Sequence, residues 1–406
     1  AGLEPARPFW WPVPSLVALG TGAWALSFLV GRVPAPPPDP VSTRAAADAG
    51  ASRRRFLWLG ASVGGAGLLA GFLGDRIVAW GGAGGTAPGP FVPVELPSRS
   101  MSPFPAGLEG QVPGLSALVT PASEFYRVDT ALVVPRVDPT TWSLSIDGMV
   151  DHPFSLGWDE LLAMEPVEKA VTLACVSNDV GGPYIGSARW LGARTSELLA
   201  RAGVQAGADQ VLSTSQDGFT VSTPLAALTD GREALVAYGM NGAALPLEHG
   251  YPVRLLTPGL YGFVGATKWL VRMTLTTYST APAYWTVRGW STVGNIKPSS
   301  RIEVPRDRAS VRAGVVRVGG TAWAHGVGVG RVQVRVDRGP WQDATLGPDA
   351  GIEYWRQWVF DWNAMAGEHE LQVRVVDAAG TPQDEAIVPP FPSGSSGLHT
   401  ATVVVA

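Results

Sequence analysis

A single cysteine, Cys175, lies in the stretch VTLACVSNDVGG. Val171, Leu173 and Val176 around it have the pattern of a buried strand, and polar, turn-forming residues follow at once. A free thiol in such a place is most often a small buried hydrophobic group. A thiolate is also a soft ligand that suits a transition metal. The thiol by itself leaves both interpretations open, and the rest of the chain has to favour one of them.

Composition narrows the chemistry that the chain can carry. A length of 406 residues suits two or three domains. The net charge is −4 and the Lys and Arg residues are scattered, which argues against a nucleic-acid-binding protein. One cysteine excludes an internal disulfide, a CxxC zinc site and haem c attachment. The five histidines are far apart and no HExxH motif occurs, so we do not expect a histidine-built metal site.

Two segments with different patterns must position the polar residues. Residues 116–300 alternate β-patterned and helical runs, which predicts a mixed α+β domain. In it, WSLSIDGMV and VTLACV predict strands, LGWDELLAM and RTSELLARAGV predict short helices, and QVLSTSQDGFTVSTPL predicts a hairpin. Residues 301–406 show strands spaced by turns without a long helix, a pattern typical of an immunoglobulin-like sandwich. The glycine-rich HGVGVGRV has no helix after it, so we interpret it as a strand and not as a phosphate loop.

Residues 1–80 predict a membrane anchor with two transmembrane helices. Residues 9–30 are apolar for 22 positions without a charge, and residues 56–79 form a second, glycine-rich apolar segment. Between them SRRRFL, from Ser52 to Leu57, is similar to the twin-arginine export motif. Arginines on this loop make it cytoplasmic by the positive-inside rule, so we expect the rest of the chain outside the cytoplasm. Residues 81–115 are then a linker, and Ala1 in place of Met leaves open an upstream piece with further helices.

Four separated motifs, taken with Cys175, resemble one known family. TLACVSN, ARWLGARTSELLARAGV, HGYPVRLLTPGLYGFVGATKWLVRM and AYWTVRGW occur in this order, with the predicted sandwich behind them. Over roughly residues 116–406 the chain is similar to the sulfite oxidase family of molybdenum-cofactor enzymes. The resemblance implies an oxidoreductase in which Cys175 binds molybdenum beside the dithiolene of one molybdopterin. It also implies a sandwich of the kind that mediates dimers, so a homodimer is compatible with it.

The resemblance supplies candidate contacts to the pterin and its phosphate. In chain order they are Tyr126, Arg127, Asp217, His249, Arg254, Ala266, Thr267 and Lys268. His249 and Arg254 fall where the family holds the pterin, and Lys268 falls on the stretch that grips the phosphate. Each position has a plain alternative: Asp217 suits a hairpin turn, His249 a turn before glycine, and the two cations a strand edge. Their joint occurrence in the family's order favours the cofactor.

The sequence departs from sulfite oxidases where those enzymes bind sulfite. Their anion-binding arginine and the histidine two residues later are replaced by Val128 and Thr130, and their active-site tyrosine falls near Trp290. Arg288 and Arg127 are the candidates for the missing charge. A pocket with a valine and an indole suits a bulkier, less charged substrate than sulfite. We therefore predict oxygen-atom transfer on a sulfoxide or sulfite-like substrate, small or protein-bound, with Cys175, Trp290 and Arg288 as catalytic residues.

Electrons need a route that this chain does not carry. It has no haem or iron–sulfur motif, so we expect a membrane haem protein, a quinone-linked partner or a soluble cytochrome. Two further interpretations stay open. One is a scaffold that has kept the fold and lost catalysis, and the other is a subunit of a membrane redox complex whose helices do the main work.

Overall fold

The computed structural model describes Leu96 and residues 103–406. The chain divides into two compact units, Ala1–Gly89 and Pro90–Ala406, and the described residues belong to the second. The predicted transmembrane segments 9–30 and 56–79, the twin-arginine-like motif and most of the 81–115 linker lie outside the described residues. In the part of the chain that is described, no helix is both long and apolar enough to cross a membrane.

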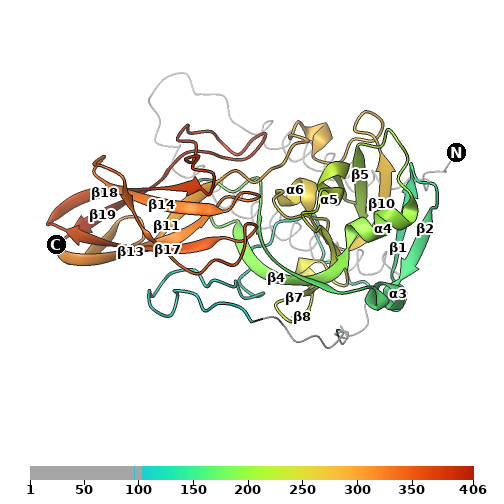
Figure 1. Ribbon diagram of the computed structural model, residues 1–406, viewed down its shortest axis with the longest axis horizontal. Coiled ribbons are helices and arrows are strands. Elements are labelled where there is room, and N and C mark those ends of the chain that lie inside the picture. Colours follow the sequence, from blue (N-terminus) through green and yellow to red (C-terminus); the bar gives the residue numbers. More distant parts are fainter. Residues whose placement is uncertain (1–95, 97–102) are drawn as a thin grey trace, which may run out of the picture. The chain divides into compact units, whose positions relative to one another are not determined.

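The first half of the described chain contains two sheets (Figure 1). One has the order β2-β1-β10-β5-β6, with β1 parallel to β10 and the other pairs antiparallel. Its strands are β1 (Ser143–Gly148), β2 (Phe154–Gly157), β5 (Gln210–Ser215), β6 (Thr220–Pro224) and β10 (Leu270–Thr276). The other has the order β3-β4-β7-β8, and β9 pairs with β7. Its strands are β3 (Val167–Ala174), β4 (Ile185–Arg194), β7 (Leu235–Met240), β8 (Ala243–Ala244) and β9 (Arg254–Leu256).

Short helices connect these strands. They are α3 (Trp158–Ala163), α4 (Thr195–Ala202), α5 (Leu225–Thr229), α6 (Gly262–Gly265), and the single turns η1 (Leu247–His249) and η2 (Thr286–Arg288). The first two confirm the helices predicted from LGWDELLAM and RTSELLARAGV. α4 buries Leu198 and Leu199 and ends at Gly203, whose φ of 67° is a left-handed conformation that glycine adopts without a side-chain clash. The mixed α+β interpretation of this half is confirmed.

The predicted hairpin around Asp217 is present. β5 and β6 pair with Thr214 opposite Thr220, and Gly218 takes a φ of 84° in the turn. The Phe219 N–H donates a 3.2 Å hydrogen bond to Asp217 Oδ1, which is the local bond that makes Asp a good turn residue. The turn therefore follows from local chemistry.

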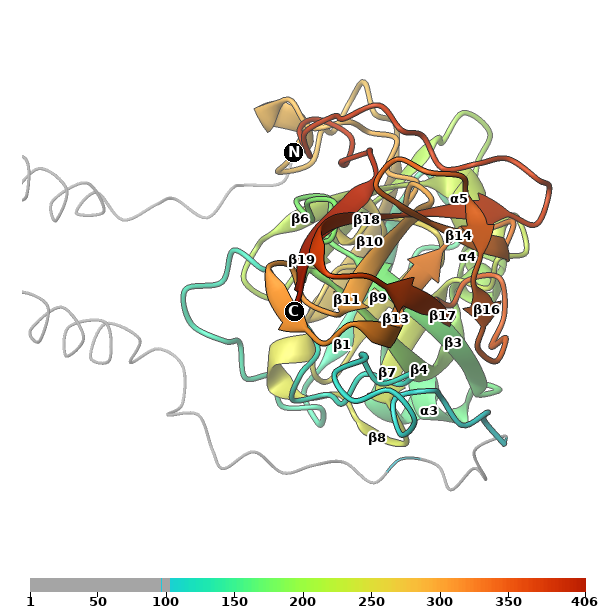
Figure 2. The same ribbon diagram turned by 90° about the vertical axis from the view of Figure 1, so that its left-hand side faces the viewer.

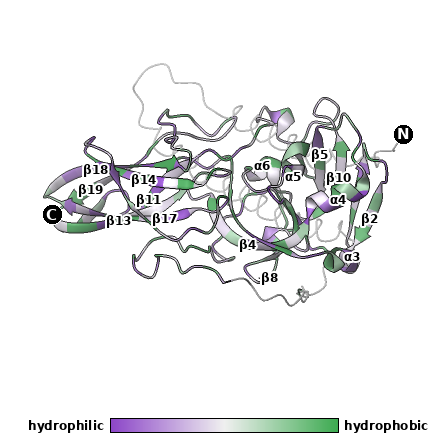
Figure 3. Ribbon diagram, viewed as in Figure 1, coloured by the Kyte–Doolittle hydropathy of each residue, from purple (hydrophilic) through white to green (hydrophobic). Residues whose placement is uncertain are grey.

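Residues 299–406 form two facing sheets (Figure 2). One has the order β11-β13-β17-β16, with β11 (Ser299–Val304), β13 (Gly314–Trp323), β17 (Arg356–Ala364) and β16 (Thr345–Leu346). The other has the order β12-β19-β18-β14-β15, with β12 (Ala309–Val311), β19 (His399–Val405), β18 (Gly367–Asp377), β14 (Val329–Val336) and β15 (Gln342–Asp343). One core, which includes Val318, Trp358, Val373 and Val403, is shared by both sheets. Hydrophilic and hydrophobic stretches alternate along these strands in Figure 3, as expected for strands with one buried face.

The sandwich prediction holds for the two-sheet arrangement, and HGVGVGRV does lead into a strand, β14. The immunoglobulin type remains a prediction. The end of the predicted linker is packed and not free: Val112 and Leu115 are buried, and the Leu108 N–H donates a 2.7 Å hydrogen bond to Gln357 Oε1 on β17. Residues 103–115 form no helix or strand, but they lie on the sandwich.

Trp355, just before β17, joins the sandwich to β3. Its ring is 2% exposed, its indole N–H donates to the Leu118 carbonyl at 2.8 Å, and its backbone N–H donates to Thr172 Oγ1 on β3 at 2.8 Å. The residue after β3 is Cys175, so this contact fixes the end of the strand that presents the thiol.

We expect Trp355→Ala to lower the free energy of unfolding by about 3–5 kcal/mol, because it leaves a cavity and removes one of the two hydrogen bonds that the Leu118 carbonyl accepts. Met365→Ala, at a side chain exposed on the sandwich, should change it by no more than about 0.5 kcal/mol. Denaturant unfolding measures both values, and equal effects of the two substitutions would contradict the role given to Trp355.

Candidate active site

A cavity of about 230 Å³ lies beside the end of β3. Its walls come from the segment around residue 126, the β5–β6 hairpin, η1, β9, α6 and the stretch that contains η2. The lining residues are Phe125, Tyr126, Val128, Asp129, Thr130, Leu173, Cys175, Val176, Ser177, Ser215, Asp217, Phe219, His249, Arg254, Gly262, Phe263, Ala266, Lys268, Trp269, Trp285 and Trp290. Residues far apart in sequence thus meet in one pocket.

Cys175 stands on a turn directly after β3 and not within the strand that VTLACV predicts. β3 ends at Ala174, the Cys175 N–H donates to the Tyr184 carbonyl at 2.9 Å, and the Asn178 N–H donates to the Cys175 carbonyl at 3.1 Å. These bonds turn the chain, so the thiol lines the cavity with Sγ 3.0 Å from Ser177 Oγ. Inside the strand, by contrast, Leu173 and Ala174 are fully packed. The turn explains why a cysteine here differs from an ordinary core residue.

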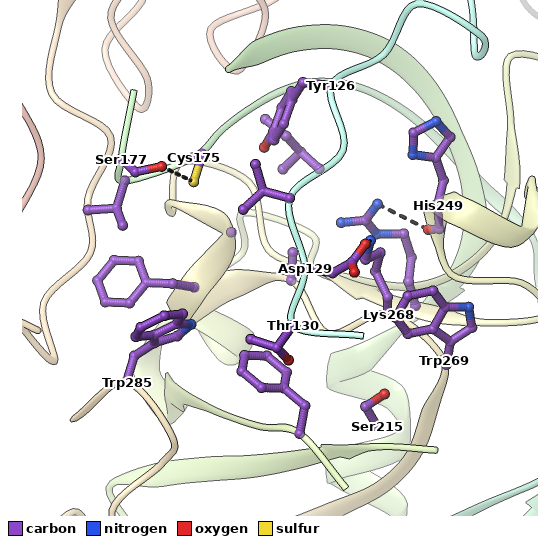
Figure 4. Close-up of a pocket in the computed structure, with 18 of the residues that line it drawn as sticks. Tyr126, Asp129, Thr130, Cys175, Ser177, Ser215, His249, Lys268, Trp269 and Trp285 are labelled. Carbon is purple, nitrogen blue, oxygen red and sulfur yellow. Dashed lines mark hydrogen bonds and ion pairs between the residues drawn. The ribbon is translucent and has the colours of Figure 1, made fainter. Parts of the chain in front are cut away.

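The opposite side of the cavity is cationic (Figure 4). Arg254 is buried, and burial lowers the pKa of its guanidinium to about 10. One guanidinium nitrogen donates to the His249 carbonyl at 3.2 Å, the group lies 4.9 Å from the Trp190 ring centre, and Nε has no partner. A buried donor without an acceptor indicates a place for a ligand that supplies one.

Lys268 lies on the same side. Its ammonium donates to Asp129 Oδ2 at 2.5 Å and to the Glu248 carbonyl at 2.9 Å. Burial lowers the pKa of Lys268 to about 8, against the opposing effect of Asp129. Burial raises the pKa of Asp129, but hydrogen bonds from Arg127 and Lys268 outweigh it and the net shift is downward. The carboxylate is therefore ionised and shared by two cations.

His249 fastens a neighbouring segment. Its Nε2 lies 2.9 Å from the Ala122 carbonyl, which makes it the hydrogen-bond donor there. Burial lowers the pKa of His249, the Ala122 carbonyl raises it less, and Arg254 and Lys268 lower it further. The ring is thus neutral near neutral pH.

The side near Cys175 is aromatic. Trp285 and Trp290 are 6.1 Å apart between ring centres, and Phe263 lies 5.8 Å from Trp290. Phe391, on a loop of the sandwich, packs against Trp290 with the two ring centres 5.2 Å apart. In Figure 4 Cys175 and Trp285 lie on one side of the pocket, and His249, Lys268 and Trp269 lie on the other. Cys175 thus lies on the aromatic side of the pocket, and Lys268 lies across the pocket from it.

Most of the residues predicted from sequence meet in the cavity. Those that line it are Tyr126, Cys175, Asp217, His249, Arg254, Ala266, Lys268 and Trp290. Burial, together with the nearby Cys175, raises the pKa of Tyr126 above its ordinary value, so its phenol is a hydrogen-bond donor.

Three predicted residues do not line the cavity. Arg127 is half-exposed and paired with Asp129 through Nε at 2.8 Å. Arg288 is exposed and folds onto Tyr284, with its guanidinium 3.5 Å from that ring centre and a 2.7 Å bond to the Tyr284 carbonyl. Thr267 is buried behind the wall, with Oγ1 2.7 Å from Ser213 Oγ. Neither arginine supplies a cation inside the cavity.

Sequence reasoning missed Asp129, Ser215, Phe219 and Trp285. Asp129 stands between Val128 and Thr130, which drew attention for what they replace, and an acidic residue beside them was itself a signal. Trp285 and Trp290 share the motif AYWTVRGW, where the spacing of two tryptophans pointed to one wall. Ser215 ends β5 with a buried hydroxyl that has no partner, which only the packing shows.

The residues present fit a dithiolene-held metal. Among the described residues no group of three His, Cys, Asp or Glu side chains could hold a metal ion, so a metal at Cys175 must bring most of its ligands with it. The unpartnered Ser215 Oγ and Arg254 Nε and the ammonium of Lys268 offer donors for an anionic, polar organic group across the cavity. Molybdopterin has both properties.

Comparison with known proteins agrees with this geometry. Residues 131–285 match the family described as the oxidoreductase molybdopterin binding domain. The uncharacterized oxidoreductase YuiH of Bacillus subtilis is 32% identical over 186 residues, which cover 46% of this chain and 89% of that protein. The chain belongs to the sulfite oxidase family of molybdopterin-dependent oxidoreductases. Its cofactor is the molybdenum cofactor.

Longer relatives match a larger share of the chain. Mitochondrial sulfite oxidase of Mus musculus is 32% identical over 320 residues, which cover 67% of this chain and 58% of that protein. The chain thus spans under two thirds of the length of the sulfite oxidases it matches. The crystal structure of the sulfane dehydrogenase SoxCD from Paracoccus pantotrophus aligns with a TM-score of 0.60 at 22% identity, covering 70% of this chain and 80% of that one. That likeness supports the fold.

We expect Cys175→Ser to lose molybdenum or to lose one sulfur from the metal's coordination shell, because the family resemblance implies that the Cys175 thiolate is the protein's ligand to the metal. Elemental mass spectrometry gives the metal content and X-ray absorption gives the Mo–S scattering. Ser177→Ala, which removes only the hydroxyl beside Sγ, is the matched control and should keep both. Unchanged content and spectrum in Cys175→Ser would return the thiol to a packing role.

We expect stability to fall with acid partly through His249. Because the folded state depresses the pKa of His249, the unfolded chain takes up the proton first, so its contribution is complete above about pH 6.5 and is lost as the pH falls through the lowered pKa. His249→Gln keeps a donor for the Ala122 carbonyl and removes the titration, so the unfolding free energy should fall less steeply between pH 7 and 5. The exposed His152→Gln should leave the slope as it is. An unaltered slope in His249→Gln would contradict the assignment.

Proposed function

We propose that this protein is a membrane-anchored, extracytoplasmic molybdenum-cofactor oxidoreductase that moves an oxygen atom to or from sulfur in a sulfoxide-type substrate. The observation that carries the proposal is the lining of the cavity by Val128 and Thr130, where the resemblance places the sulfite-binding arginine and the histidine after it. The neighbouring arginines do not replace the lost charge, since Arg127 is paired with Asp129 and Arg288 is folded onto Tyr284.

The charge distribution supports a neutral substrate. A sulfite dianion loses strong hydration on entering a pocket and needs cations in return. The cations that line this cavity are Arg254 and Lys268, and the family resemblance assigns both of them to the cofactor. Lys268 lies across the pocket from Cys175 in Figure 4. A sulfoxide carries a dipole and no net charge, so apolar walls and one or two donors suffice.

The residues of the cavity have different proposed roles. When bound, the cofactor supplies the two-electron couple for the transfer of one oxygen atom. Cys175 holds the metal, and the Tyr126 phenol is a protonated donor next to it. Trp285, Trp290 and Phe263 exclude water and accommodate the organic groups of the substrate. The names of the relatives, sulfite oxidase and sulfane dehydrogenase, support chemistry at sulfur.

The proposed cellular location and the proposed electron-transfer partner are inferred from the sequence. The apolar segments 9–30 and 56–79 with arginines between them support an anchor whose loop is cytoplasmic. The given sequence shows one cysteine and no haem or iron–sulfur motif, which supports a haem or quinone-linked partner that exchanges electrons at the mouth of the cavity. The anchor would keep that mouth near a membrane-bound partner.

We expect the cofactor-loaded protein to turn over a sulfoxide in preference to sulfite. Val128→Arg should shift the ratio of kcat/KM values toward sulfite by about tenfold or more, because it restores a cation in the cavity. Val133→Arg adds the same charge on the same segment outside the cavity and should not shift the ratio. Assays use a reduced viologen with sulfoxide and ferricyanide with sulfite. Preference for sulfite in the parent would overturn the substrate class, and no turnover of any oxygen donor or acceptor would favour the scaffold.

A further inference from the structure

Two carboxylates line the cavity, Asp129 and Asp217, and Asp129 is the one that pairs with Lys268, a cation expected to hold an anion of the cofactor. The Asp129 side chain is 9% exposed and lines the cavity. It accepts a 2.5 Å hydrogen bond from Lys268 Nζ and a 2.8 Å bond from Arg127 Nε. Neither the family resemblance nor the proposed function gives it a task. A buried carboxylate beside the lysine that is expected to grip the cofactor's phosphate requires an explanation.

Asp129 belongs to residues 121–134, which we name the crossing segment. Figure 4 shows Tyr126, Asp129 and Thr130 of this segment running across the pocket between Cys175 and Lys268. Residues 126–134 form no helix or strand, and Leu132 and Val133 farther along are exposed. The segment is fastened at one end by the His249 bond to the Ala122 carbonyl and by Phe125 in the core. For the part of the crossing segment that follows Phe125, the hydrogen bond from Lys268 to Asp129 is the polar attachment to the cavity wall.

We propose that Asp129 is a positioning residue that holds Lys268 and the crossing segment in the cofactor-free protein, and that the phosphate of the cofactor takes its place on Lys268. This proposal rests on the role of Lys268 that the family resemblance implies.

The donor count supports the exchange. An ammonium has three hydrogens, and those of Lys268 serve Asp129 and the Glu248 carbonyl, which leaves one. A phosphate on that third hydrogen would lie within a few ångströms of the Asp129 carboxylate, and two such anions repel each other strongly in a pocket that excludes water. Arg127 offers Asp129 a second partner, since it bonds both carboxylate oxygens, at 2.8 and 3.3 Å. The carboxylate can therefore leave Lys268 without losing every cation.

The exchange also moves the segment. If Asp129 leaves Lys268, residues after Phe125 lose their polar attachment and the cavity opens on that side. Entry of the cofactor and release of the segment are then the same event. Asp129 thus keeps a buried ammonium paired until a stronger anion arrives.

The test uses the full chain produced without cofactor, with inorganic phosphate as the probe, in slightly acidic buffer. Calorimetry should show phosphate binding about tenfold tighter to Asp129→Asn than to the parent, because the competing anion is gone. Lys268→Met should abolish binding in either background. Asp129→Glu should resemble the parent, and Asp138→Asn, at an exposed carboxylate outside the cavity, is the matched control.

Hydrogen exchange supplies a second measurement. Amides of residues 126–134 should exchange more slowly in the parent than in Asp129→Asn, and phosphate should raise their exchange rates in the parent but not in Asp129→Asn. A merely structural role of Asp129 would change the exchange rates without changing the affinity for phosphate.

The outcomes separate this proposal from those it rests on. One result would be equal phosphate affinity in the parent and in Asp129→Asn, with no binding to Lys268→Met. It would overturn the replacement of Asp129 by phosphate and leave the role of Lys268 intact. Binding that survives Lys268→Met, or no binding to Asp129→Asn, overturns the exchange together with that role. Neither result depends on the molybdenum measurement with Cys175→Ser, so the assignment as a molybdenum enzyme is tested separately.

Discussion

The pocket is organised by a buried positive charge that the protein alone does not neutralise. Arg254 is 6% exposed, and in the described part of the chain no carboxylate forms an ion pair with it. A charge removed from water costs several kcal/mol unless hydrogen bonds and an opposite charge offset it. One carbonyl and the face of Trp190 offset only part of that cost. A cofactor that brings its own negative charge completes this side of the pocket.

The other features follow from this charge. The metal end must lie away from the cations, since a thiolate beside Arg254 would pair with it and lose its use as a ligand. β3 therefore delivers Cys175 on the far side, and the bridge from Trp355 to Thr172 fixes the strand end that carries it. The sandwich contributes Phe391, which packs against Trp290 of the cavity wall, so the second half of the described chain supports the site. Apolar walls there keep water from the reacting atoms.

Local chemistry made much of this visible in the sequence. The hairpin at Asp217, the end of α4 at Gly203 and the strands of residues 299–406 depend on near neighbours, so their patterns predicted them. Cys175, His249, Arg254 and Lys268 stood in a family order that short motifs preserve. Asp129 and Ser215 could not be assigned in this way, because their roles arise from partners 139 residues away, for Asp129, or from a missing partner, for Ser215. The orientation of Arg288 could not be predicted for the same reason, because the sequence does not show that its guanidinium packs on the Tyr284 ring.

The same pocket bears on when the cofactor can enter. The cations of the cavity are buried before any ligand arrives, so an anionic ligand gains ion pairs with them when it binds. A ligand that binds only the folded chain stabilises it in proportion to its affinity. A chain with this pocket is thus more stable after loading than before. The motif at Ser52 to Leu57, if it directs export as its similarity to the twin-arginine signal predicts, serves a route that carries folded domains. A cofactor held by buried cations is best inserted on the side of the membrane where it is made, and a loaded, folded domain is the form such a route would carry across.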